Sequence, residues 1–143
     1  MTHPLRLKAT DAEDLAVISA CLQDALVLVG DMTYQAEERR FVMVANRFQW
    51  EVPPDEAGQF ARITTGVSFE GVTAVNRRKI DLSHGEAILS LLAIQPGAGG
   101  LQLEFSEGGA IRLEVAAILC HLEDVGEAWP TRWRPRHPID ETP

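Results

Sequence analysis

Two short segments in the last third of the chain alternate apolar and polar residues on either side of a glycine-containing turn. The apolar positions are Leu101, Leu103 and Phe105 before the turn and Ile111, Leu113 and Val115 after it. Because successive side chains of a β-strand point to opposite faces, this pattern predicts an antiparallel hairpin with one apolar face. Such a face needs a second layer of the protein to cover it.

Further strands are expected upstream of this hairpin. Residues 25–34 and 41–50 are rich in β-branched and aromatic side chains, and the polar turn 36–39 separates them. This arrangement predicts a second hairpin. Residues 62–75 are also typical of a strand, with bulges or bends at their glycines.

Residues 87–94 are open to two interpretations. The spacing of Ser83 and Glu86 resembles a helix cap, whereas Pro96-Gly97 ends the segment early and favours a strand, which we expect. The glycine-rich residues 97–100 are expected to be a hairpin connection, because a phosphate-binding loop would lead into a helix.

Two helices are expected, one near each end of the chain. Thr10 and Glu13 have the spacing of a capping box, and Leu15, Ile18 and Leu22 follow at helical spacing. A second apolar stripe at helical spacing consists of Val115, Ile118, Leu119, Leu122 and Val125. Gly126 follows it where a helix would be capped, so we expect a C-terminal amphipathic helix that covers the sheet.

These elements predict an α+β fold built on an antiparallel β meander, with an N-terminal helix and a C-terminal helix over the sheet. A sandwich, a partly open barrel and a pleckstrin-homology-like arrangement all stay open. The chain of 143 residues is long enough to bury a core and is expected to be one domain. Its 45% apolar and 24% charged residues are typical of a globular protein.

The net charge of −8 makes nucleic acid an unlikely partner, since a broad basic face is missing. The N-terminal residues lack the apolar core of a signal peptide, and no apolar run reaches the length of a membrane span. We therefore expect a cytoplasmic protein. Cys21 and Cys120 are then expected to be reduced, inert side chains in apolar surroundings.

The C-terminal residues 129–143 combine tryptophan, arginine and proline on an otherwise acidic chain. The side chains of interest are Trp129, Arg132, Trp133, Arg134 and Arg136. The prolines forbid a continuous helix, so the segment is expected to be extended. It is either a strap that anchors both indoles on the domain, which we favour, or a segment that grips an anionic or aromatic partner.

A second candidate binding site lies in residues 46–51. Arg47 is flanked by aromatic residues and could bind a carboxylate or a phosphate, with Trp50 and Glu51 beside it. The simpler interpretation, which we favour, is a strand whose Arg47 pairs with an internal acid.

The remaining polar clusters carry weaker signals. Asp81, Ser83, His84 and Glu86 are close in sequence but are expected to form a polar turn, because a triad depends on spatial geometry. The histidines and cysteines lack metal-ligand spacing, so neither a metal nor a cofactor is expected. Basic side chains at 39–40 and 77–79 could form a basic rim, although charged loops are usually just solvated.

Several segments resemble a family of small alphaproteobacterial proteins catalogued as domain of unknown function 2948. The resemblance is carried by residues 14–20, 22–25 and 46–51, the hairpin 105–113 and the tail 129–137. It spans about residues 5–138 and implies a bacterial cytosolic single domain. No assigned activity or catalytic residue comes with it.

Taken together, the sequence favours a non-enzymatic interaction or ligand-binding domain, whose partner would be another protein or a small anionic ligand. The first alternative is a small enzyme with a site around Arg47, Glu51, Asp81 and His84. The second is a structural subunit of a homo- or hetero-oligomer.

Overall fold

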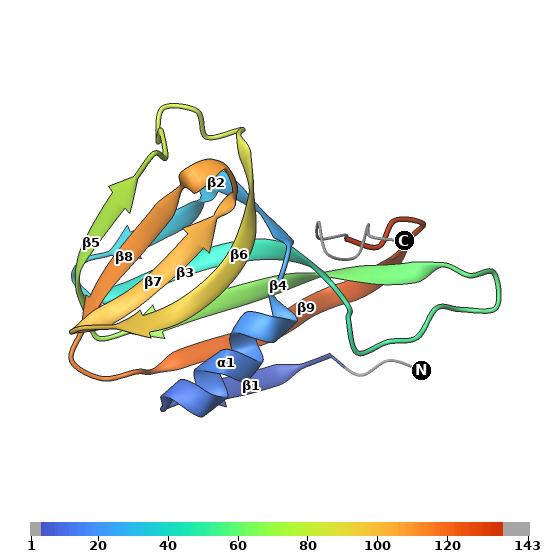
Figure 1. Ribbon diagram of the computed structural model, residues 1–143, viewed down its shortest axis with the longest axis horizontal. Helices are drawn as coiled ribbons and strands as arrows, with labels where there is room; N and C mark the ends of the chain where they lie inside the picture. Colours follow the sequence, from blue (N-terminus) through green and yellow to red (C-terminus); the bar gives the residue numbers. More distant parts are fainter. Residues whose placement is uncertain (1–3, 136–143) are drawn as a thin grey trace.

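The computed structural model describes residues 4–135 of the chain. In this range one open antiparallel sheet contains nine strands in the order β1-β9-β4-β3-β2-β6-β7-β8-β5 (Figure 1). The elements are β1 (Arg6–Ala9), α1 (Ala12–Cys21), β2 (Ala25–Gln35), β3 (Arg40–Phe48), β4 (Phe60–Glu70), β5 (Val72–Arg78), β6 (Ile88–Gly97), β7 (Gly100–Phe105), the 3₁₀ turn η1 (Ser106–Gly108), β8 (Ala110–Val115) and β9 (Cys120–Thr131). The predicted α+β class with antiparallel strands is confirmed.

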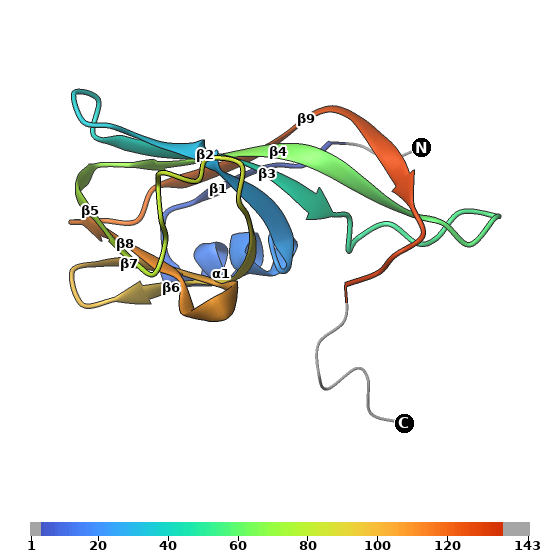
Figure 2. The ribbon, with the colours of Figure 1, turned by 90° about the horizontal axis from the view of Figure 1, so that it is seen from above.

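The sheet curls so that its two halves face each other across the core. β4 leads directly into β5 across Gly71, whose φ of +71° lies in the left-handed region that favours glycine. The middle of the sheet is thereby joined to its far edge. Figure 2 shows β1, β9, β4, β3 and β2 in one wall and β6, β7, β8 and β5 in the other, with α1 beside β6.

The helix α1 covers the open side of the curled sheet. Its N-cap is Asp11, whose side chain accepts a hydrogen bond from the Asp14 N–H at 2.8 Å, and the predicted cap at Thr10 is wrong by one residue. Leu15, Ile18 and Leu22 face the core as predicted and are fully buried. Residues 4–135 contain no helix long and apolar enough to cross a membrane.

The predicted hairpins are confirmed. β7 pairs with β8, β2 pairs with β3, and residues 88–97 form strand β6 as preferred. The glycine-rich residues 97–100 connect β6 to β7, with Gly97 opposite Gly100. β7 and β8 show the alternation of side chains from which they were predicted.

The predicted C-terminal helix is wrong, and with it the argument for a pleckstrin-homology-like arrangement. Residues 120–131 form the long strand β9, which pairs with β4 on one side and β1 on the other. Cys120, Leu122 and Asp124 face the interior at every second position. The alternation is not evident in the sequence because the inward row contains the charged residue Asp124. The strand also has apolar residues on both faces, and together their spacing resembles that of an amphipathic helix.

Candidate functional site

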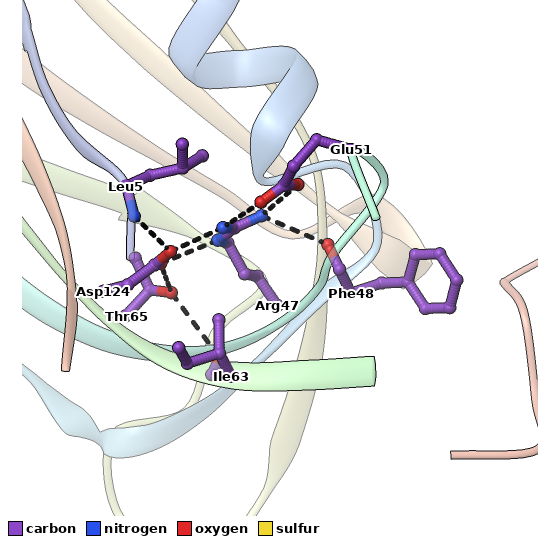
Figure 3. Close-up of polar contacts among 7 residues, drawn as sticks. All are labelled: Leu5, Arg47, Phe48, Glu51, Ile63, Thr65 and Asp124. Atoms are coloured by element: carbon purple, nitrogen blue, oxygen red, sulfur yellow. Dashed lines mark hydrogen bonds and ion pairs between the residues drawn. The ribbon is translucent and has the colours of Figure 1, made fainter. Parts of the chain in front are cut away.

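Arg47, near the end of β3, is fully buried. Its guanidinium donates to both carboxylate oxygens of Asp124, from Nε at 2.8 Å and from Nη2 at 2.6 Å (Figure 3). It also donates to both oxygens of Glu51, from Nη1 at 3.0 Å and from Nη2 at 2.8 Å, and to the Phe48 carbonyl at 3.4 Å. A guanidinium has five N–H donors, so every donor of Arg47 has a partner.

The Asp124 carboxylate is as fully bonded as the arginine. Besides Arg47 it accepts from the Thr65 hydroxyl at 2.7 Å and from the Leu5 N–H at 2.8 Å. These partners come from β3, from β4 and from the residue just before β1, while Asp124 itself belongs to β9. The buried charges therefore hold four segments of the first wall in register, as Figure 3 shows.

The network fixes the charge of its members. Burial opposes the ionisation of Asp124, but hydrogen bonds from Arg47, from the Leu5 N–H and from Thr65 outweigh it and hold its pKa below the ordinary value. Burial also opposes the ionisation of Glu51, but the hydrogen bonds from Arg47 outweigh burial and lower the pKa of Glu51 below its ordinary value. For Arg47 burial favours loss of the proton, yet the two carboxylates raise its pKa.

The predicted pairing of Arg47 with an internal acid is thus confirmed. The residues of the alternative enzyme site lie in two separate parts of the structure, with Arg47 and Glu51 in one and Asp81 and His84 in the other. Asp81 and His84 lie in the exposed loop between β5 and β6, where His84 Nε2 is 3.6 Å from the Asp81 carboxylate. Within residues 4–135, no hydrogen bond or ion pair links this loop to Arg47 or Glu51.

Trp50 and Arg134 meet although they are distant in sequence. The Arg134 guanidinium lies 5.6 Å from the centre of the Trp50 ring, a cation–π contact. The Trp50 indole N–H donates to the Gln23 carbonyl at 3.1 Å, and its ring packs edge-on against Phe48. Two open hollows adjoin Trp50 and Glu51, of about 480 Å³ on the side of α1 and about 340 Å³ on the side of residues 52–54.

Neither cysteine has the environment of a nucleophile. Cys21 lines the hollow between α1 and Trp50, and burial raises the pKa of its thiol above the ordinary value. Burial raises the pKa of Cys120, in the core, to about 12. Both side chains are therefore protonated thiols at neutral pH.

The C-terminal segment divides into a strand and a connecting stretch. Trp129 belongs to β9, pairs with Arg62 and is 37% exposed. Trp133 is 81% exposed, so the prediction that it anchors the tail is wrong. Arg132 follows the end of β9, and Arg136 lies outside the described residues. Arg134 is the tail arginine that contacts an aromatic ring.

The outward side of the sheet, from β9 to β6, carries a group of exposed apolar side chains, here called the apolar outer face. Its members are Leu26, Leu28, Val44, Ile88, Val125 and Trp129, which are 36–62% exposed. Strand pairing places Leu28 opposite Ile88 in β6. Leu26 and Val125 lie in one row across the sheet, with the polar residues Asn46 and Thr64 between them. Sequence reasoning missed this face, although Leu26 and Leu28 alternate with the buried residues of β2.

Two hollows indent the apolar outer face and meet at Val44, which lines both. The first, about 390 Å³, extends over β2 to Ile88 and Trp129, and the second, about 330 Å³, extends over β4 to β9. Gly66 lines the second hollow in mid-strand. It lies outside the left-handed region, and a Cβ there would meet only the Glu123 carbonyl oxygen, at 3.9 Å. Neither backbone conformation nor crowding requires glycine at this position.

Two of the arginines in the basic segments pair with acidic side chains. Arg40 is paired with Glu70 at 2.8 Å, and Arg78 lies 3.9 Å from Glu104. Residues 77–79 lie at the end of β5, an edge strand of the sheet, where cationic side chains discourage pairing with another chain. Among the described residues, no group of three or more His, Cys, Asp or Glu side chains could hold a metal ion.

Comparison with known proteins gives one match. A family model described as "Protein of unknown function (DUF2948)" matches residues 5–137. No curated protein and no solved structure matches the chain. The matched range includes α1 and all nine strands.

Proposed function

The chain belongs to the DUF2948 family of proteins of unknown function, and from that premise we propose that it is a non-enzymatic interaction domain that binds another protein on its apolar outer face. The observation that supports this proposal is the exposure of six large apolar side chains on four strands, β9, β3, β2 and β6. Soluble monomers seldom expose a broad continuous apolar surface, and such surfaces mark sites of protein association.

The shape of the face favours a macromolecular partner. A small-molecule site is usually a cavity that encloses most of its ligand, whereas these hollows are open to solvent and adjoin each other at Val44. Polar side chains such as Asn46 and Arg62, joined by a 2.6 Å hydrogen bond, lie next to the apolar members. An apolar centre with bonded polar neighbours is the usual composition of a protein interface.

The chemistry of the other candidate residues supports binding over catalysis. Arg47 cannot receive a substrate carboxylate or phosphate without losing a bond to Asp124 or Glu51, since all its donors are used. A small anionic ligand remains the second candidate. It is favoured by Arg134, whose guanidinium lines the hollow beside Trp50.

Site-specific photo-crosslinking tests the proposal. A photoreactive amino acid is placed at Val44 on the apolar outer face and, as a matched control, at Val17, which is exposed on α1. After irradiation in native cytosol, we expect a discrete crosslinked species from position 44 that is missing from position 17. The species should disappear when Ile88→Ser and Leu28→Ser are added. Equal crosslinking from both positions, or none from position 44, would contradict the proposal.

A further inference from the structure

We propose that the partner presents a cationic amphipathic helix, with its apolar side on the apolar outer face and Lys or Arg side chains towards Asp31 and Glu123. This inference rests on the proposed function and names the class of segment that the face receives. It follows from three features of the face, namely its backbone, its charges and the floor of its second hollow.

The paired backbone of the sheet favours a helix over an extended segment as the occupant of the face. A sheet face presents side chains, because the N–H and C=O groups of its strands are already paired within the sheet. An extended segment laid on such a face would leave its own backbone groups without partners. A helix satisfies its backbone internally and can bury an apolar stripe, which is how helices cover sheets within domains.

The charges of the face select a cationic helix. Asp31 lines the first hollow and Glu123 lines the second, and none of the described lining residues of either hollow is Lys or Arg. Glu123 has one ion pair, with Arg6 at 3.5 Å, in which both side chains are exposed. Asp31 has no ion pair within residues 4–135. The net charge of −8 adds a long-range attraction for a cationic partner.

The same charges argue against a second copy of this chain as the occupant. Two copies joined through this face would bring Asp31 and Glu123 of one against the equivalent acids of the other. The chain's own helix α1 is also unsuitable, because its apolar side is buried in the core and its first turn carries Glu13 and Asp14.

Gly66 gives the face its depth. A side chain at this position would fill the floor of the second hollow, yet the fold leaves room for one. Glycine within a strand weakens the sheet, and its presence there often marks the close approach of another chain. At the far end of the first hollow, the partly exposed Trp129 offers a ring to an apolar or cationic side chain.

Binding of two designed peptides to the full chain tests the inference. Both are amphipathic helices of about 18 residues with leucine on one side, and they carry lysine or glutamate on the other. Fluorescence anisotropy of labelled peptide should show the lysine peptide binding at least about tenfold more tightly at low salt, and added salt should narrow the difference.

Three variants locate the binding. Asp31→Asn should weaken the lysine peptide about threefold or more, whereas Glu13→Gln, which removes the same charge from α1, should not. Gly66→Val should weaken it about tenfold while the melting temperature stays unchanged or rises, because valine suits a strand better than glycine.

The possible outcomes separate this inference from the proposed function. Equal binding of both peptides, or equal effects of Asp31→Asn and Glu13→Gln, would overturn the cationic partner while leaving an apolar docking face. Crosslinking from Val44 to a protein, combined with no binding of either peptide, would refute the helix alone. If position 44 crosslinks to another molecule of this chain, the occupant of the apolar outer face is a second copy and not a cationic helix of a partner. Peptide binding that appears only after removal of residues 132–143 would replace it by the chain's own tail.

Discussion

Arg47 and Asp124 form a fully hydrogen-bonded ion pair in the interior of the protein. Removing two charges from water is costly, and the pair is tolerated because each donor and acceptor is bonded in fixed geometry. An apolar pair of similar volume could fill the same space. What the ion pair adds is specificity, since a shift of β9 against β3 would leave both charges without partners.

The first prediction concerns this pair. Asp124→Asn leaves Arg47 buried with one carboxylate instead of two, and we expect the free energy of unfolding to fall by about 3–5 kcal/mol in urea melts. Arg47→Met combined with Asp124→Leu should cost less than the sum of the two single changes, because neither fully buried charge is then left without its partner. Glu51 still loses Arg47, but its side chain is partly exposed to solvent. Additive losses would show that the two side chains act independently.

The second prediction concerns acid. The folded pKa values of Asp124 and Glu51 lie below their ordinary values of 3.8 and 4.5, so the unfolded chain binds more protons in this range. Their contribution to stability is complete above about pH 4.5 and is lost as the pH falls through the folded values. Melts between pH 6 and pH 2.5 should show this decline, with a shallower slope for Glu51→Gln. Identical slopes would mean that Glu51 titrates alike in both states.

The third prediction separates the two C-terminal tryptophans. Trp129→Ala removes a ring that is 37% exposed and should cost about 1–3 kcal/mol. Trp133→Ala removes a ring that is 81% exposed and should change stability by less than about 0.5 kcal/mol. Thermal melts of both variants give the comparison. A large loss of stability on Trp133→Ala would show that Trp133 anchors the tail after all.

At the scale of elements, the strands that alternate cleanly could be predicted from the sequence and β9 could not. β7 and β8 have apolar residues at every inward position, which fixes their period. In β9 the inward row contains Asp124, whose burial depends on an arginine 77 positions earlier in the chain. Local patterns carry no information about such a partner, so the strand was mistaken for a helix.

The candidate site was predictable to a similar extent. The isolated Arg47 between aromatic residues indicated an internal ion pair, but neither Asp124 nor Thr65 could be identified as its partner. The contact of Trp50 with Arg134 joins two segments that were proposed separately. The apolar outer face could not be predicted from the sequence because its residues come from four strands, and only the topology brings them together.

The fourth prediction concerns α1. Leu15 is fully buried under the sheet, and Leu15→Ala should cost about 2–5 kcal/mol in urea melts because it leaves a cavity. Val17→Ala, on the exposed side of the same helix, should change stability by less than about 0.5 kcal/mol. Losses of similar size for both variants would mean that the helix does not close the core as described.

For the whole molecule, the apolar outer face should be detectable without a partner. A dye that fluoresces on apolar surfaces, such as anilinonaphthalene sulfonate, should bind the native protein at neutral pH. Val44→Ser with Ile88→Ser should reduce this fluorescence by about half or more while the melting temperature stays close to that of the unmodified protein. Leu82→Ser, in the exposed loop between β5 and β6, is the matched control. An unchanged signal would place the dye elsewhere on the molecule.

The seam between β1 and β9 also sets the order of events during synthesis. The Leu5 N–H bonds to a carboxylate 119 positions further along, and within residues 4–135 β9 is the one strand that pairs with β1. At about 5–20 residues per second, a ribosome needs about 6–24 s to make the intervening chain. Throughout that interval the first strand has no partner and the core stays open on that side. A chain that ends before Cys120 therefore lacks every residue that pairs with β1, and this edge of the core stays open.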